Sequence, residues 1–174
     1  MSTYFYTHKG IEIKPLDIIL VGTKKGFVPW AIKKFTKCKY NHAAIVAECL
    51  DELWVYEAQA KGFYPTKRLD QWIMDHEKNG DYLCFMDSKE TLLEKRKGFQ
   101  RISRLIGKNY EFLNLTLFQL SRIFFSKFPG PKNNNQVICS EAVAYVYQEY
   151  FPKHYQTTPK ELLESDNLKI KLEC

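Results

Sequence analysis

The sequence lacks the cysteine pattern of a disulfide-bonded or zinc-binding protein. Its five cysteines, at positions 38, 49, 84, 139 and 174, form no CxxC pair and follow no regular spacing. An odd number of scattered cysteines argues against a disulfide framework, and only four histidines accompany them. We therefore expect free thiols in a reducing compartment, with no metal and no other cofactor.

Long uninterrupted apolar runs are also missing. The first apolar run, Ile18 to Val21, is short and follows Asp17, which does not resemble a signal peptide. The longest run, Leu113 to Phe125, is too short to span a bilayer and contains Asn114 and Arg122 among other polar residues. We expect a protein that is cytoplasmic or associated with a virion or host, without a transmembrane helix.

What the sequence does contain suits one globular domain. It has 174 residues, of which 45% are hydrophobic, enough for a full core. We expect a single domain over residues 1–174, with an apolar helical insertion at about residues 112–131. The 12 phenylalanines and 11 tyrosines favour an apolar or aromatic-lined cleft.

Positive charge is concentrated in one segment. The net charge is +6, and six lysines but no acidic residue lie between Gly22 and Tyr40. Phe27, Trp30 and Phe35 are interspersed with them. The segment is either a solvated helix face or a surface that attracts an anionic substrate, membrane or polymer. No nucleic-acid-binding motif accompanies the charge, so we expect no specific nucleic-acid partner.

Hydrophobic periodicity predicts a mixed α+β chain. The predicted strands cover residues 11–14, 17–21, 42–48, 53–59, 82–86 and 168–172. The predicted helices cover residues 28–35, 66–75, 89–105, 112–125, 139–150 and 158–162. A turn around Asp51-Glu52 makes the third and fourth strands a hairpin.

Cys139 is a candidate nucleophile because it stands where a polar, Asn-rich loop becomes a helix. The partial positive charge of a helix N-terminus favours a thiolate. A cysteine entering an apolar helix is otherwise a small buried hydrophobe. His42 begins a predicted strand and is followed by Ala43 and Ala44, which leave room beside its ring. It is either the base for the thiol or a structural histidine at a strand end.

Glu57 is the best candidate to orient the imidazole. If the hairpin loop has an even number of residues, His42 and Ala44 share a sheet face with Glu57 and Gln59. Gln59 is then the rival orienting residue, whereas an odd loop breaks the arrangement.

The order of several short motifs resembles one known family. The motifs are Lys14-Pro15-Leu16-Asp17-Ile18-Ile19-Leu20, Tyr40-Asn41-His42-Ala43-Ala44-Ile45-Val46, Trp54-Val55-Tyr56-Glu57-Ala58, Gly107-Lys108-Asn109-Tyr110-Glu111-Phe112, Ile138-Cys139-Ser140-Glu141 and Thr158-Pro159-Lys160-Glu161-Leu162. In this order they resemble the circularly permuted branch of the NlpC/P60 superfamily, the YiiX-like (YaeF/YiiX) papain-like cysteine hydrolases. One departure is Leu16, which stands where that family usually has a glycine.

The resemblance implies a permuted papain-like α+β fold, with a small antiparallel sheet or partial barrel packed on the nucleophile helix. It implies Cys139 as nucleophile, His42 as general base and acid, and Glu57 as the group that holds His42. The Cys139 N–H is a natural oxyanion donor, and Tyr40 or Tyr110 is a candidate for a second donor, although packing roles fit both tyrosines.

These expectations describe a thiol-dependent hydrolase, amidase-like or peptidase-like, or an acyltransferase. Its substrate would be a small amide or ester, a peptide, a lipid-like molecule or a cell-wall-derived one. The lysine-rich segment with the apolar 112–131 segment favours an anionic or lipid-like substrate. The alternative is a non-catalytic binding module of the same fold at an anionic membrane or polymer surface. The oligomeric state stays open.

Overall fold

The computed structural model describes residues 5–88, 92–110, 136–152 and 157–174. Its centre is a six-stranded sheet in the order β10-β7-β3-β4-β5-β6, in which every neighbouring pair is antiparallel. The strands are β3 (Ile18–Gly22), β4 (His42–Cys49), β5 (Glu52–Gln59), β6 (Gly62–Arg68), β7 (Tyr82–Ser88) and β10 (Leu168–Glu173). Two small pairs accompany it: β1 (Tyr6–His8) with β2 (Ile11–Ile13), and β8 (Asn109–Tyr110) with β9 (Gln136–Val137).

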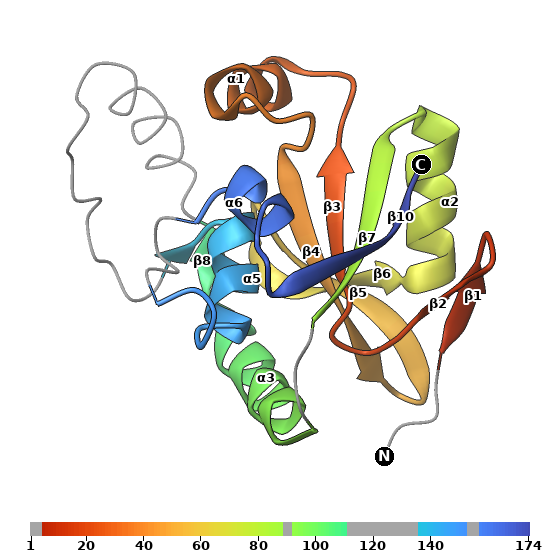
Figure 1. Cartoon of the computed structure of the whole chain (residues 1–174), viewed down its shortest axis with the longest axis vertical. Helices are drawn as coiled ribbons and strands as arrows, with labels where there is room; N and C mark the ends of the chain where they lie inside the picture. The colour runs from red at the N-terminus through yellow and green to blue at the C-terminus, as the bar shows by residue number, and fades with distance from the viewer. Residues whose placement is uncertain (1–4, 89–91, 111–135, 153–156) are drawn as a thin grey trace.

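The helices lie around this sheet (Figure 1). They are α1 (Phe27–Thr36), α2 (Leu69–Asn79), α3 (Leu92–Leu105), α5 (Cys139–Val146) and α6 (Pro159–Leu163). The predicted α+β class with an antiparallel sheet is therefore confirmed. None of the helices in the described ranges is long and apolar enough to cross a bilayer. The predicted insertion at about residues 112–131 and its helix over residues 112–125 lie entirely outside the described residues.

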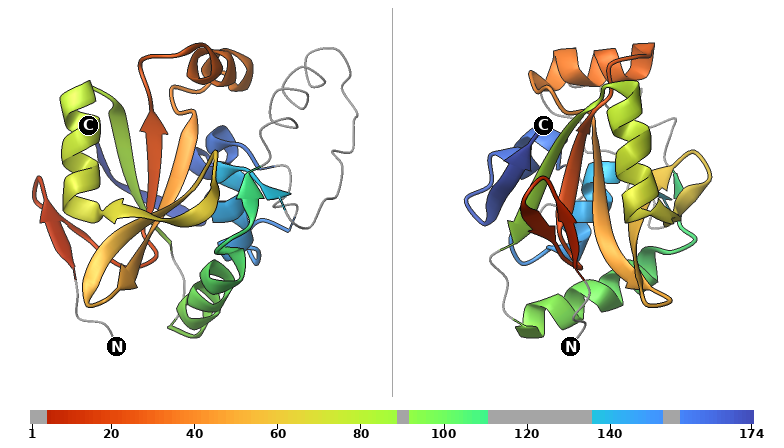
Figure 2. Two further views of the ribbon diagram at one scale, coloured as in Figure 1. Left: turned by 180° about the vertical axis from the view of Figure 1, so that it is seen from behind. Right: turned by 90° about the vertical axis from the view of Figure 1, so that its right-hand side faces the viewer.

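The sheet buries both of its faces, one under α5 and the other under α2 (Figure 2). Alternate residues of β4 divide between them, because successive side chains of a strand point to opposite faces. Ala43 and Ile45 belong to the core beneath α5, whereas Ala44 and Val46 belong to the core beneath α2. This explains why β4 reads as an uninterrupted apolar run.

The β4–β5 hairpin has a two-residue loop, Leu50 and Asp51, both with left-handed backbone (φ 52° and 61°). Two successive positive φ values are typical of the type I′ turn that joins twisted antiparallel strands. The register pairs Ala44 with Glu57 and Val46 with Val55. The even loop assumed from the sequence is thus confirmed, and the turn sits one residue earlier than predicted.

The strand β6 was not predicted. Residues 66–68 were expected to begin a helix, but they extend the strand, and α2 begins at Leu69. Pro65 lies within β6, which is tolerated because β6 is an edge strand of the sheet. Pairing with β5 therefore decides the structure here, against a weak local pattern.

Leu16 takes the backbone conformation that favours glycine, with φ 72°. Its side chain is buried in the core beneath α5, and its carbonyl accepts a hydrogen bond from the Tyr147 hydroxyl. Burial and this hydrogen bond hold a leucine where the resemblance predicts glycine.

Candidate active site

Cys139 is the first residue of α5. Ile138 before it is extended (φ −96°, ψ 163°), and Val137 pairs with Tyr110 in the short parallel ladder of β8 and β9. The thiol is 5% exposed and accepts hydrogen bonds from the backbone N–H groups of Ala43 and Ser140. The chain thus turns into a helix at the thiol, as the sequence predicted.

His42, the first residue of β4, joins Cys139 to Glu57. Its Nε2 lies 2.6 Å from Glu57 Oε2, and its side chain also hydrogen-bonds to the Cys139 thiol. Since Glu57 occupies Nε2, Nδ1 is the ring nitrogen that faces the thiol. The His42 side chain is 20% exposed and that of Glu57 only 4%, so the imidazole lies between solvent and a buried carboxylate.

Glu57 is held by three more donors, all to its second oxygen. Oε1 accepts from Gln59 Nε2 at 2.9 Å, from Thr66 Oγ1 at 2.7 Å and from Trp72 Nε1 at 3.1 Å. The donors come from β5, β6 and α2. A carboxylate that accepts four hydrogen bonds has a fixed orientation, and it fixes the ring that binds to it. Gln59 therefore contacts Glu57 in this structure, and Thr66 and Trp72 are site residues that the sequence did not reveal.

The three titratable groups favour an ion pair. Burial alone lowers the pKa of His42, but attraction to Cys139 and Glu57 outweighs it and raises this pKa to about 10. Burial opposes ionisation of Cys139, yet His42 and the two backbone N–H groups lower the pKa of its thiol. Burial likewise opposes ionisation of Glu57, and its hydrogen bonds with His42, Thr66 and Trp72 lower its pKa to about 2. These shifts favour a thiolate beside an imidazolium beside a carboxylate.

Tyr40 and Tyr110 are the candidates for a second oxyanion donor. Tyr40 is fully buried, and its hydroxyl donates to Glu173 Oε1 at 2.7 Å. That hydroxyl is occupied, so we do not carry Tyr40 forward as an oxyanion donor. Tyr110 lies in β8, where its backbone pairs with Val137, and its side chain is outside the described part of the chain. Ser140 is also occupied, since its buried hydroxyl donates to the Thr157 carbonyl.

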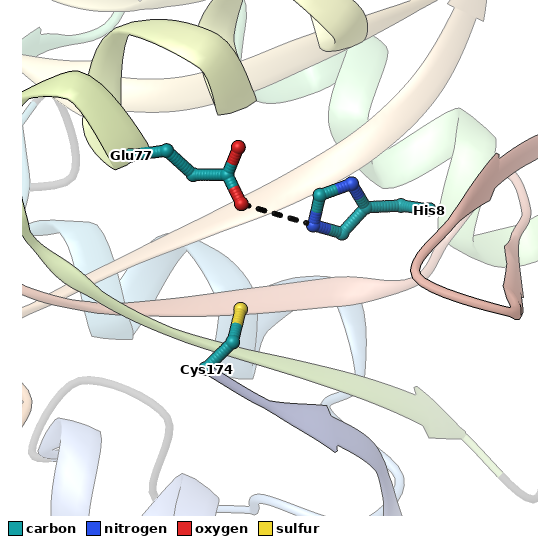
Figure 3. A group of neighbouring side chains, drawn as sticks. All are labelled: His8, Glu77 and Cys174. Carbon is teal, nitrogen blue, oxygen red and sulfur yellow. Dashed lines mark ion pairs between the residues drawn. The ribbon is translucent and has the colours of Figure 1, made fainter.

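One group of potential metal ligands occurs in the described residues, away from this site. His8 Nε2, the Glu77 carboxylate and the Cys174 thiol lie within 4.8 Å of one another (Figure 3). The His8 ring packs on Phe85, in the core beneath α2. His8 Nε2 lies 3.5 Å from Glu77 Oε1, the contact dashed in Figure 3, and makes no hydrogen bond within the described ranges. Lys9 Nζ, however, lies 2.6 Å from the same carboxylate. An ammonium group at the carboxylate opposes a bound cation, so the group is a poor fit for a metal.

The architecture defines an α+β protein with a cysteine, a histidine and a glutamate at one end of an antiparallel sheet. No family model matches the sequence, and a search of curated proteins gave no match. Among solved structures, the chain is similar to YiiX from Escherichia coli O157:H7, which is described as a metalloprotein. The TM-score is 0.67 at 19% identity, over 92% of this chain and 97% of YiiX. The two proteins share one fold, which confirms the YiiX-like resemblance at the level of the fold.

Proposed function

We propose that the protein is a thiol-dependent hydrolase or acyltransferase with a circularly permuted papain-like fold. Cys139 is the nucleophile, His42 the general acid and base, and Glu57 the group that orients His42. The observation that carries the proposal is the position of His42 between a buried thiol and a carboxylate with four donors. A structural histidine needs one good partner, whereas this ring has one on each side.

The order of the elements supports a circular permutation. The strand that carries His42 comes before the helix that carries Cys139, whereas in papain-like enzymes of ordinary order the cysteine helix comes first. The sheet nevertheless allows the two side chains to form a hydrogen bond. A histidine strand that precedes the cysteine helix, with the two side chains beside each other, is the arrangement that we expect of a permuted chain.

Acyl transfer through a thioester uses each group in turn. The Cys139 thiolate attacks the carbonyl carbon of an amide or ester, forming a carbon–sulfur bond and an oxyanion. The N–H of Cys139 at the start of α5 is directed to that oxyanion. His42 gives its Nδ1 proton to the departing amine or alkoxide as the carbon–nitrogen or carbon–oxygen bond breaks. Neutral His42 then takes a proton from water, which cleaves the thioester; another acceptor in place of water makes the reaction a transfer.

No step of this reaction passes through a metal. The metal implied by the description of YiiX has no assigned place here, and the His8, Glu77 and Cys174 group is not in contact with the three residues of the proposed mechanism.

Competitive thiol labelling tests the proposal. The full chain is treated with a limiting amount of iodoacetamide at neutral pH, and each modified cysteine is quantified by mass spectrometry. Cys139 should react first although it is buried, because its thiolate is stabilised, whereas Cys174 is exposed. A Cys139 thioester should also accumulate with activated acyl esters. Cys174 reacting faster than Cys139, with no thioester at Cys139, would overturn the proposal.

A further inference from the structure

Helix α1 has an outer face that is both aromatic and basic. Phe27, Trp30 and Phe35 are 76%, 49% and 40% exposed on this helix. The rings of Phe27 and Trp30 lie 5.6 Å apart, and Lys34 Nζ stands 4.8 Å from the centre of the Trp30 ring. We call Phe27, Trp30, Lys34 and Phe35 the α1 outer face, in which Phe35 lies at the edge nearest Val28. Exposed aromatics gathered beside a cation are uncommon on a surface that meets only water.

The segment that carries the α1 outer face contributes positive charges only. Lys24, Lys25 and Lys37 flank it and are exposed, and the sequence has no acidic residue between Gly22 and Tyr40. Within the described ranges, no acidic side chain forms an ion pair with Lys25, Lys34 or Lys37. These lysines are therefore free to meet an anionic surface.

The inner face of α1 leads to the candidate site. Ile32 is buried against Ile138, with Val28 packed beside them. Ile138 is the residue before Cys139, and the chain that leaves α1 reaches His42 after a short linker. Figure 1 shows α1 beyond the ends of β3 and β4, at the end of the sheet where His42 begins β4. The same helix thus carries the α1 outer face and packs beside the nucleophile.

We propose that the α1 outer face docks the protein on an anionic lipid bilayer and places the Cys139–His42 pair beside acyl lipids of that surface. Tryptophan and phenylalanine insert at the boundary of headgroups and acyl chains, and lysines beside them bind anionic headgroups. A double-stranded nucleic acid would use the lysines for its phosphates and leave the exposed Phe27 and Phe35 without a role. A single strand, whose bases can stack on aromatic rings, is an outcome of the test below. The docking stands on α1 alone, whereas the acyl-lipid substrate class rests on the proposed function.

Vesicle binding tests the docking without any chemistry. The full chain carrying Cys139→Ala is sedimented with vesicles of phosphatidylcholine alone, or with about one-third phosphatidylserine. We expect binding to the anionic vesicles that weakens with added salt, little binding to the neutral ones, and a blue shift of Trp30 fluorescence. Equal and negligible binding to both vesicles would overturn the docking while leaving the proposed function intact.

Matched variants locate the surface. Lys25→Gln with Lys34→Gln should weaken binding about 25-fold, at about fivefold for each lysine, whereas Lys61→Gln with Lys78→Gln should change nothing. Phe27→Ser, Trp30→Ser and Phe35→Ser together should reduce binding more than tenfold. Leu50→Ser with Met74→Ser removes exposed apolar side chains elsewhere and is the control. If the aromatic variant binds vesicles normally, or if labelled single-stranded RNA binds more tightly than vesicles, the proposal is wrong.

Turnover then tests the substrate class. With Cys139 intact, the triple aromatic variant should lose activity on an acyl lipid embedded in anionic vesicles and keep it on a soluble short-chain ester. Equal loss on both would contradict a docking role. Failure of the wild-type protein on every acyl donor would instead overturn the proposed function and leave vesicle binding as a separate result.

Discussion

The two faces of the central sheet are both buried but contribute differently to the candidate site. The face beneath α5 brings the proposed nucleophile, since Cys139 begins that helix and packs in its core. The face beneath α2 brings the support, since Trp72 of α2 binds Glu57. His42 is the first residue of β4, and its imidazole has a partner from each side, Cys139 and Glu57. In the proposed mechanism, the α5 side supplies the thiol that reacts, while the α2 side sets the orientation and charge of His42 through Glu57.

Removing the proposed nucleophile on the α5 side should cause the largest loss of activity and should change stability little. Cys139→Ala should reduce turnover of an activated acyl ester by about 10³-fold or more, since the thioester route is lost. The free energy of unfolding should change by no more than about 1 kcal/mol, because the side chain is small. Cys84→Ala, which removes a buried thiol from β7, is the control and should keep full turnover. Comparable turnover in both variants would contradict the role of Cys139.

Neutralising the carboxylate should affect both activity and stability. Glu57→Gln should lower kcat about 10²-fold or more, because the amide no longer stabilises the imidazolium. Glu57 has a pKa of about 2 in the fold against about 4.5 unfolded, so its stabilisation is present above about pH 4.5 and is lost as the pH falls towards 2. That contribution is about 3 kcal/mol. Chemical unfolding across this pH range should show that the difference in unfolding free energy between wild type and Glu57→Gln becomes smaller in acid. A difference that does not depend on pH would contradict this role of Glu57.

The hydrogen bond from α2 to Glu57 can be removed while an aromatic ring is kept in the core. Trp72→Phe keeps an aromatic ring but deletes the Nε1 donor to Glu57, and should lower kcat several-fold through lost positioning. It should raise the pKa of His42 slightly, because the ionised carboxylate then has one donor fewer to offset its charge. Trp54→Phe is the matched control, because Trp54 Nε1 is buried and forms no hydrogen bond within the described ranges. His42 titration by NMR distinguishes a positioning role from simple destabilisation. If both variants shift that pKa equally, the α2 side does not tune the histidine.

The smallest expected difference lies between two variants of Leu16, which packs on the α5 side. Leu16→Ala should cost about 2–3 kcal/mol through lost burial. Leu16→Gly should be no less stable than Leu16→Ala, because glycine relieves about 1 kcal/mol of left-handed strain at φ 72°. Urea unfolding of both variants measures this order. A glycine variant clearly less stable than the alanine variant would mean that the backbone is not strained there.

The sequence revealed the parts of the site that depend on local rules. The side-chain parity of β4 and β5 put His42 and Glu57 on one face, and the helix start at Cys139 followed from the loop before it. Thr66 and Trp72 were missed because they depend on β6. That strand contains Pro65 and has a weak alternating pattern, and its pairing with β5 stabilises it. The roles of the site residues remain proposals that rest on this geometry.

The pH profile of Cys139 alkylation tests the central claim most directly. The rate of iodoacetamide modification at Cys139 is measured by mass spectrometry across a wide pH range, in wild type and in His42→Ala, with Cys174 as the internal reference. We expect a Cys139 pKa below the ordinary thiol value of about 8.5 in wild type, and a return to that value or above it in His42→Ala. A profile that matches Cys174 in wild type and does not change in the variant would contradict it.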